Sequence, residues 1–170
     1  MPTSIKRIRF LPKKCHVKIS LYKPYHNVHF ATHGVLNYND FDSSYLVFAP
    51  DPGADHGDKL TLYDIRRLNI KGCDLVTLSA CETAVSAEVS KGWYISPANA
   101  FLINRVRSVV ASLWEVDDQS TSYLMQSFYK NLQQHPKVEA LRMAMQEVSQ
   151  MPGYEHPFFW AGFVLYGDWQ

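Results

Sequence analysis

Cysteine is scarce in this sequence, with only three among 170 residues. So few thiols, odd in number and spread along the chain, do not resemble a disulfide framework, which favours a reduced, cytoplasmic setting. No apolar run approaches the roughly 20 residues that a membrane-spanning helix needs. The first residues also lack the apolar centre of a secretory signal. We therefore expect neither a membrane protein nor a disulfide-rich secreted one.

Several motifs with well-defined chemistry are absent as well. There is no Gly-x-Ser-x-Gly turn and no glycine-rich phosphate loop, which argues against a serine hydrolase or a nucleotide enzyme. Cys-x-x-Cys and His-Glu-x-x-His are also missing. His26, His29 and His33 therefore have no neighbours at the spacing of a metal site. We expect no metal and no other cofactor.

Acidic residues are missing from residues 1–39, which hold seven of the seventeen Lys and Arg residues. The net charge of +1 hides this asymmetry. A basic arm of this kind can contact nucleic acid. However, Val17, Ile19 and Leu21 alternate with polar side chains, as in a half-buried strand. We favour the strand interpretation, treat residues 1–26 as a basic segment of edge strands, and expect no nucleic-acid partner for this chain alone.

What is present is typical of one globular domain with a substantial core, since 46% of the residues are apolar and 14% aromatic. Short β-prone runs alternate with helical periodicity, which predicts an α/β fold with a mainly parallel sheet. Strands are expected at residues 5–10, 16–22, 27–32, 45–49, 74–80, 108–114 and 158–166. Helices are expected to begin at Thr61, Ser96-Pro97, Asp117 or Asp118, and Pro136. Residues 82–95 are expected to form a loop with a helical turn.

Two of the expected strands end on residues with nucleophilic chemistry. One runs into Cys81, and the other runs into His33, which Gly34 follows. Reactive groups lie just past the carboxyl ends of strands in an open parallel sheet, so neighbouring strands would bring imidazole and thiol together. An imidazole stabilises the thiolate and can act as its base. The backbone N–H groups of Gly34 and Cys81 are the candidate oxyanion donors.

The alternative for each cysteine is a small buried hydrophobic residue, and we expect this for Cys15 and Cys73. Cys81 differs because it pairs with His33-Gly34. The separation of 48 positions between His33 and Cys81 is close to the roughly 50 positions found in caspases. The caspase signature shares Ala-Cys with residues 79–83 but not the flanking residues.

Four segments together resemble the CHAT domains, which are caspase-like cysteine protease domains of the clan that also contains separase, gingipains and metacaspases. The segments are HFATHG at residues 29–34, LSACETA at 78–84, SVVASLWEVDD at 108–118 and FWAGFVLYGD at 159–168. The resemblance implies a caspase-like three-layer α/β/α sandwich over residues 27–170, with a short N-terminal part. It also implies that His33 and Cys81 are the catalytic dyad.

Many members of this clan cut after a basic residue, which an acidic side chain holds in the first pocket. The candidate substrate-binding residues are Glu82, Trp114, Asp117 and Asp118. A helix cap is the alternative for Asp117 and Asp118, and a place in the core is equally suitable for Trp114. CHAT domains are often joined to tetratricopeptide repeats, which implies an activator or repeat-containing partner protein.

The sequence thus predicts a cytoplasmic cysteine endopeptidase that cleaves a protein partner through an acyl-enzyme on Cys81. The alternative is an inactive or regulated protease-like module that docks a protein partner through an open sheet edge.

Overall fold

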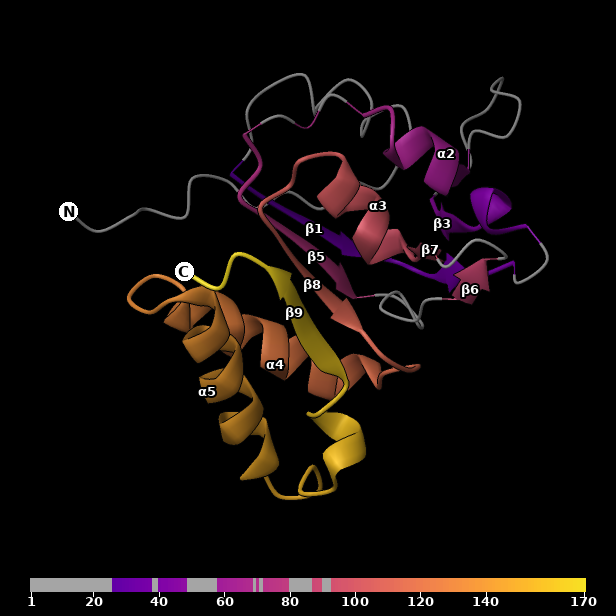
Figure 1. The fold of residues 1–170 in the computed structure, drawn as a ribbon. Coiled ribbons are helices and arrows are strands. Elements are labelled where there is room, and N and C mark those ends of the chain that lie inside the picture. The colour runs from indigo at the N-terminus through magenta and orange to yellow at the C-terminus, as the bar shows by residue number, and fades with distance from the viewer. Residues whose placement is uncertain are drawn as a thin grey trace.

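The fold is described from a computed structural model, in which residues 26–37, 40–48, 58–68, 70, 72–79, 87–89 and 93–170 are described. Figure 1 shows the arrangement of the elements. The strands are β1 (Asn27–Ala31), β2 (Gly34–Val35), β3 (Tyr45–Val47), β4 (Lys59–Thr61), β5 (Leu75–Ser79), β6 (Ala87–Val89), β7 (Trp93–Ile95), β8 (Ser108–Ser112) and β9 (Phe163–Gly167). The helices are η1 (Phe41–Ser43), α2 (Leu62–Ile65), α3 (Pro97–Ile103), α4 (Asp118–Asn131), α5 (Lys137–Ser149) and η2 (Pro157–Phe159).

A central sheet of four strands, in the order β1-β5-β8-β9, organises the described chain. β1, β5 and β8 are parallel, whereas β9 runs antiparallel to β8. Helices α4 and α5 cover one face of this sheet, and α2 and α3 cover the other (Figure 1). The mainly parallel sheet and the three-layer sandwich that the sequence predicts are confirmed.

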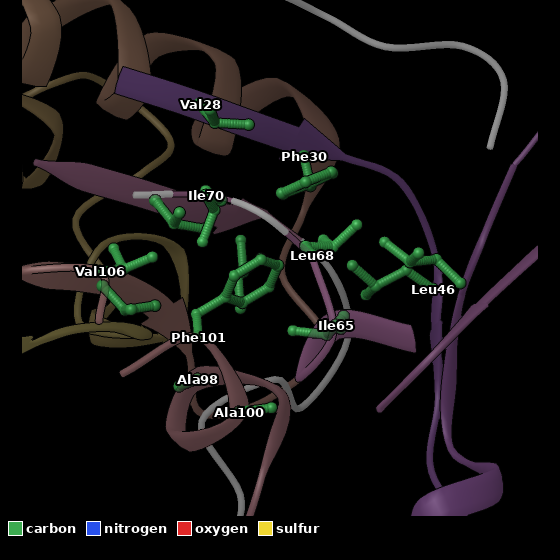
Figure 2. Packing of buried hydrophobic residues seen from close by; sticks show 14 of the residues in the cluster. Val28, Phe30, Leu46, Ile65, Leu68, Ile70, Ala98, Ala100, Phe101 and Val106 are labelled. Carbon is green, nitrogen blue, oxygen red and sulfur yellow. The ribbon is translucent and has the colours of Figure 1, made fainter. Parts of the chain in front are cut away.

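The face toward α2 and α3 has an apolar core. Phe101 of α3 is fully buried, and its ring packs against that of Phe30, with 5.5 Å between the ring centroids. Figure 2 shows Phe101 among side chains from β1, α2 and α3. Val76 and Leu78 of β5 complete this face because alternate side chains of a strand point to the same side.

The face toward α4 and α5 takes the other alternate positions of the strands. Leu75 and Val110 pack there against Leu124 and Phe128 of α4. Ala144 of α5 belongs to the same cluster, consistent with the close packing of the two helices. The same strands therefore supply two separate cores, one on each side of the sheet.

Side-chain caps account for where three helices begin. Thr61 and Asp64 form a reciprocal capping box at α2, as the sequence predicts. Ser96 accepts a hydrogen bond from the Asn99 N–H, with Pro97 in the first turn of α3. Asp117 accepts one from the Ser120 N–H at the start of α4.

Some expected boundaries were wrong. Within residues 82–95, where a loop with a helical turn was expected, the described residues form two short antiparallel strands, β6 and β7, consistent with β-branched and aromatic residues there. The last strand is shorter than residues 158–166 suggested, because Pro157 opens a turn of 3-10 helix that the His156 ring caps. The strands expected at residues 5–10 and 16–22 lie outside the described residues.

Across the described ranges, no helix combines the length and the apolar character needed to cross a bilayer.

Candidate active site

Strands β1 and β5 end side by side. They pair in parallel register, so that Ala31 lies opposite Ser79 at the carboxyl end of both. In the sequence, His33 follows Ala31 by two positions, and Cys81 follows Ser79 by two positions. His33 is described, whereas Cys81 and Glu82, like Cys15, lie outside the described residues.

Backbone contacts on both sides hold the segment that carries His33. The Thr32 N–H donates to the carbonyl oxygen of Ser79 at 3.3 Å, which continues the pairing of β1 with β5. The Val47 N–H donates to the carbonyl oxygen of His33 at 2.8 Å, and the Thr32 hydroxyl donates to the carbonyl oxygen of Val47. The chain at His33 is therefore tied to β5 on one side and to β3 on the other, while the His33 side chain is exposed.

Gly34 opens β2 and lies opposite Leu46 in the antiparallel ladder with β3. Hydrogen-bonded and non-hydrogen-bonded pairs alternate along an antiparallel ladder. Because Val47 and His33 form a hydrogen-bonded pair, the next pair, Gly34 and Leu46, is not hydrogen-bonded, and its N–H groups point away from the partner strand. The ladder with β3 consequently does not engage the Gly34 N–H.

A cavity of about 680 Å³ lies between the ends of β1 and β5 and one side of α4. Residues that line it include His29, Ala31, His33, Ser79, Glu115, Asp118, Thr121, Met125, Gln126 and Tyr129. Its size is within the range of small-ligand and side-chain pockets. Among the described residues, the buried hydroxyl oxygen of Thr121 has no hydrogen-bond partner.

Polar side chains form a layer beside this cavity, on the α4 side of the sheet. The Nε2 atom of His29 and the Oγ atom of Ser79 are hydrogen-bonded at 2.8 Å. The Tyr129 hydroxyl donates to the Thr77 hydroxyl oxygen at 2.9 Å. Burial lowers the pKa of His29 to about 4 and raises the pKa of Tyr129 above its usual range. Both side chains are therefore uncharged at neutral pH.

The acidic and aromatic candidates from the sequence lie in different places. Asp118 lines the cavity, as does Glu115, which sequence reasoning missed although it directly follows Trp114. Asp117 caps α4. The Trp114 ring N–H donates to the carbonyl oxygen of Phe158, and the ring lies closely against Gly162. Neither Asp117 nor Trp114 is among the residues that line the cavity.

Sequence reasoning also missed the contribution of α4 to the cavity. Thr121, Met125 and Tyr129 recur every four residues, and all three line it. The neighbouring series at positions 124, 128 and 132 is more apolar and is the pattern expected of the face that packs on the core. Leu124 and Phe128 are indeed buried in the α4 core. The four-residue spacing of Thr121, Met125 and Tyr129 was the sequence signal that could have indicated a second functional face of α4.

Cys73 is the buried, inert thiol that the sequence predicts. Burial raises the pKa of Cys73 to about 12, so the thiolate is not populated near neutral pH. In the described ranges, His, Cys, Asp and Glu side chains do not gather in a group that could hold a metal ion.

Comparison with known families identifies the class of this fold. The CHAT domain family matches residues 12–168, and the chain belongs to this family. Its central sheet and flanking helices are those of a caspase-like α/β/α fold.

Among individual proteins, the chain is 32% identical over 103 residues to tetratricopeptide repeat protein 28 of Mus musculus. It is 32% identical over 110 residues to tetratricopeptide repeat protein 28 of Homo sapiens. These matches cover 60% and 64% of this chain but only 4% of each relative, so the chain spans a small fraction of their length.

Two solved structures share the fold at 13% sequence identity. One is the separase–securin complex of Saccharomyces cerevisiae, with a TM-score of 0.54 over 83% of this chain and 8% of the other. The second is a protease, with a TM-score of 0.52 over 91% of this chain and 36% of the other. At this identity the likeness concerns the fold alone.

Proposed function

We propose that this domain is a cysteine endopeptidase that cleaves a protein partner, with Cys81 as nucleophile and His33 as general acid and base. The observation that carries the proposal is the register of β1 and β5, which end level with each other two residues before His33 and Cys81. A cavity opens at the same ends of the two strands. Nucleophilic catalysis needs a base within reach of the thiol and a site for the acyl group.

The reaction follows from these groups. The His33 imidazole takes the Cys81 proton, and the thiolate attacks the carbonyl carbon of the scissile peptide bond. The N–H groups of Gly34 and Cys81 donate to the oxyanion that forms. His33 then gives the proton to the leaving amine as the C–N bond breaks, which leaves a thioester on Cys81. Water that His33 deprotonates hydrolyses the thioester and regenerates the thiol.

Acidic side chains on the cavity suggest which residue precedes the cut. Glu115 and Asp118 line the cavity, together with the apolar side chain of Met125 and the buried hydroxyl of Thr121. Carboxylates and an apolar side chain in one cavity suit the charged end and the long stem of lysine or arginine. We therefore propose a basic residue before the scissile bond, with Glu82 contributing to the same pocket. A reducing compartment such as the cytoplasm would keep the thiol active.

A peptide probe that ends in a lysine-derived electrophile tests the proposal. Wild-type protein should form a covalent adduct at Cys81, Cys81→Ala should form none, and His33→Ala should react more slowly at neutral pH. Equal labelling of the wild type and Cys81→Ala would show that Cys81 is not the nucleophile. An unchanged rate in His33→Ala would remove His33 from the mechanism.

A second candidate function is a protease-like module that binds a protein partner without cleaving it. Two observations favour it: among the described residues β1 pairs only with β5, and the curated relatives are tetratricopeptide repeat proteins. Light scattering with a separately expressed tetratricopeptide-repeat protein, alongside cleavage of a peptide pool, separates the two functions. Turnover by the isolated chain contradicts the pure binding role, and binding without turnover contradicts the peptidase.

A further inference from the structure

The hydrogen bond between His29 and Ser79 joins the two strands that lead to the proposed dyad. In the register, His29 lies opposite Thr77, and Ser79 lies opposite Ala31. The bond between the Nε2 atom of His29 and the Oγ atom of Ser79 is therefore diagonal, reaching from β1 to the last residue of β5. This side-chain hydrogen bond connects β1 and β5 in addition to the backbone hydrogen bonds of their ladder.

The surroundings of His29 restrict the position of its ring. The residue is only 4% exposed, and its ring packs against that of Tyr129 from α4 at 5.6 Å between centroids. A ring held in this way can act as a fixed anchor for Ser79, because a buried side chain has few rotamers open to it. The titratable groups that line the same cavity are His33, Glu115, Asp118 and Tyr129.

The neighbouring bond between Tyr129 and Thr77 provides a comparison within the same layer. It is nearly the same length, at 2.9 Å, and is likewise partly buried, but it connects β5 to α4. It does not connect the two strands that precede His33 and Cys81. Loss of either bond removes one partly buried hydrogen bond, but only the bond between His29 and Ser79 links the ends of β1 and β5 to each other.

We propose that His29 is a positioning residue, which through Ser79 holds the end of β5 against β1 so that Cys81 and His33 keep their reactive geometry. This inference rests on the proposed function. It adds a role for the first histidine of the HFATHG segment, whose ring nitrogen is hydrogen-bonded to Ser79. Small displacements of a nucleophile from its base have large kinetic effects, on the order of 100-fold for 1 Å.

Alkylation of Cys81 by iodoacetamide tests the inference without requiring peptidase activity. Mass spectrometry separates Cys81 from Cys15 and Cys73, and the rate is followed as a function of pH. His29→Leu and Ser79→Ala each break the bond and should lower the rate at pH 7 by about tenfold, with a higher pH midpoint. His29→Gln keeps a hydrogen-bonding group near Ser79 and should stay much closer to wild type.

Thr77→Val is the matched control, because it removes the neighbouring bond and leaves the strand exits tied. It should lower the melting temperature as Ser79→Ala does, with little change in alkylation. Wild-type alkylation of a folded Ser79→Ala variant would overturn the inference, as would an equal loss in Thr77→Val. If His29→Leu does not fold, Ser79→Ala decides the question, since Ser79 is only partly buried.

The outcome is independent of the peptidase assay. Loss of alkylation in Ser79→Ala together with no cleavage of any peptide would retain the positioning role and contradict the endopeptidase. Peptide cleavage that is equally fast in Ser79→Ala and wild type would support the endopeptidase and contradict the positioning role.

Discussion

The two faces of the central sheet differ most at the carboxyl ends of its strands. Toward α3 the side chains stay apolar to the strand ends, with Phe30 and Leu78 buried against Phe101 and its neighbours. Toward α4 the apolar core gives way to His29 and Thr77, beside the cavity. The same two strands thus present an apolar face and a polar one.

The difference shows how one sheet separates stability from chemistry. Apolar burial contributes roughly 25 cal/mol per Å² to stability, and an uninterrupted apolar face leaves no polar group that needs a partner. Buried polar groups need hydrogen-bond partners, which restricts their positions. The polar layer on the α4 face therefore adds order to the strand ends, whereas the α3 face supports the sheet.

The largest effect is expected on the α3 face. Phe101→Ala should lower the free energy of unfolding by about 3–5 kcal/mol, because it removes a fully buried aromatic ring. Urea unfolding measures this, with Ile103→Ala as the control on the same helix, where the side chain is 64% exposed. A loss below 1 kcal/mol for Phe101→Ala would show that the α3 face does not hold the sheet.

The pH dependence of stability should report the α4 face. The pKa of His29 is about 4 in the folded protein and 6.5 in a model peptide, so the unfolded chain binds a proton first as pH falls. This residue should lower the free energy of unfolding by about 3 kcal/mol between pH 7 and pH 4, with no further loss well below the folded pKa. The comparison is with His29→Gln, which cannot take up this proton. Parallel pH curves for the two proteins would contradict a buried, neutral His29.

The acidic side chains of the cavity should affect selectivity more than stability. Glu115→Gln and Asp118→Asn should each reduce the preference for lysine- over norleucine-derived probes roughly tenfold or less, because a charge partner is lost. Glu139→Gln serves as the control, since Glu139 pairs with Arg142 on α5 and does not line the cavity. Unchanged selectivity in the double variant would place the basic side chain elsewhere.

The smallest effect is expected at the start of α4. Asp117→Ala should cost about 1 kcal/mol of unfolding free energy, through loss of the hydrogen bond that its carboxylate accepts from Ser120. Probe selectivity should stay constant, in contrast to Asp118→Asn. A change in selectivity with unaltered stability would instead make Asp117 a substrate-binding residue.

The fold was largely predictable because its strands and caps are local patterns. The apolar runs before His33 and Cys81 predicted two adjacent parallel strands, and β1 and β5 confirm them. The Thr61 and Ser96 caps are likewise short-range signals, and both are present. The pairing of β6 with β7 was missed because β-prone stretches of three residues are too short to be distinguished from a loop.

The site was only partly predictable because its walls depend on packing. Their position after a strand suggested both Asp117 and Asp118 as substrate-binding residues. Only Asp118 lines the cavity, whereas Asp117 caps α4. The residue at which α4 begins decides which of the two adjacent carboxylates caps the helix and which lines the cavity. The bond between His29 and Ser79 spans 50 positions in the sequence, so no local pattern indicates it.

The central claim is that His33 and Cys81 form one reactive pair, and the ionisation of the Cys81 thiol tests it most directly. Alkylation followed from pH 4 to pH 10 should give a Cys81 midpoint below the ordinary thiol pKa of about 8.5, which His33→Ala moves upward. A wild-type midpoint at or above 8.5 that His33→Ala leaves unchanged would contradict the pairing and the peptidase built on it.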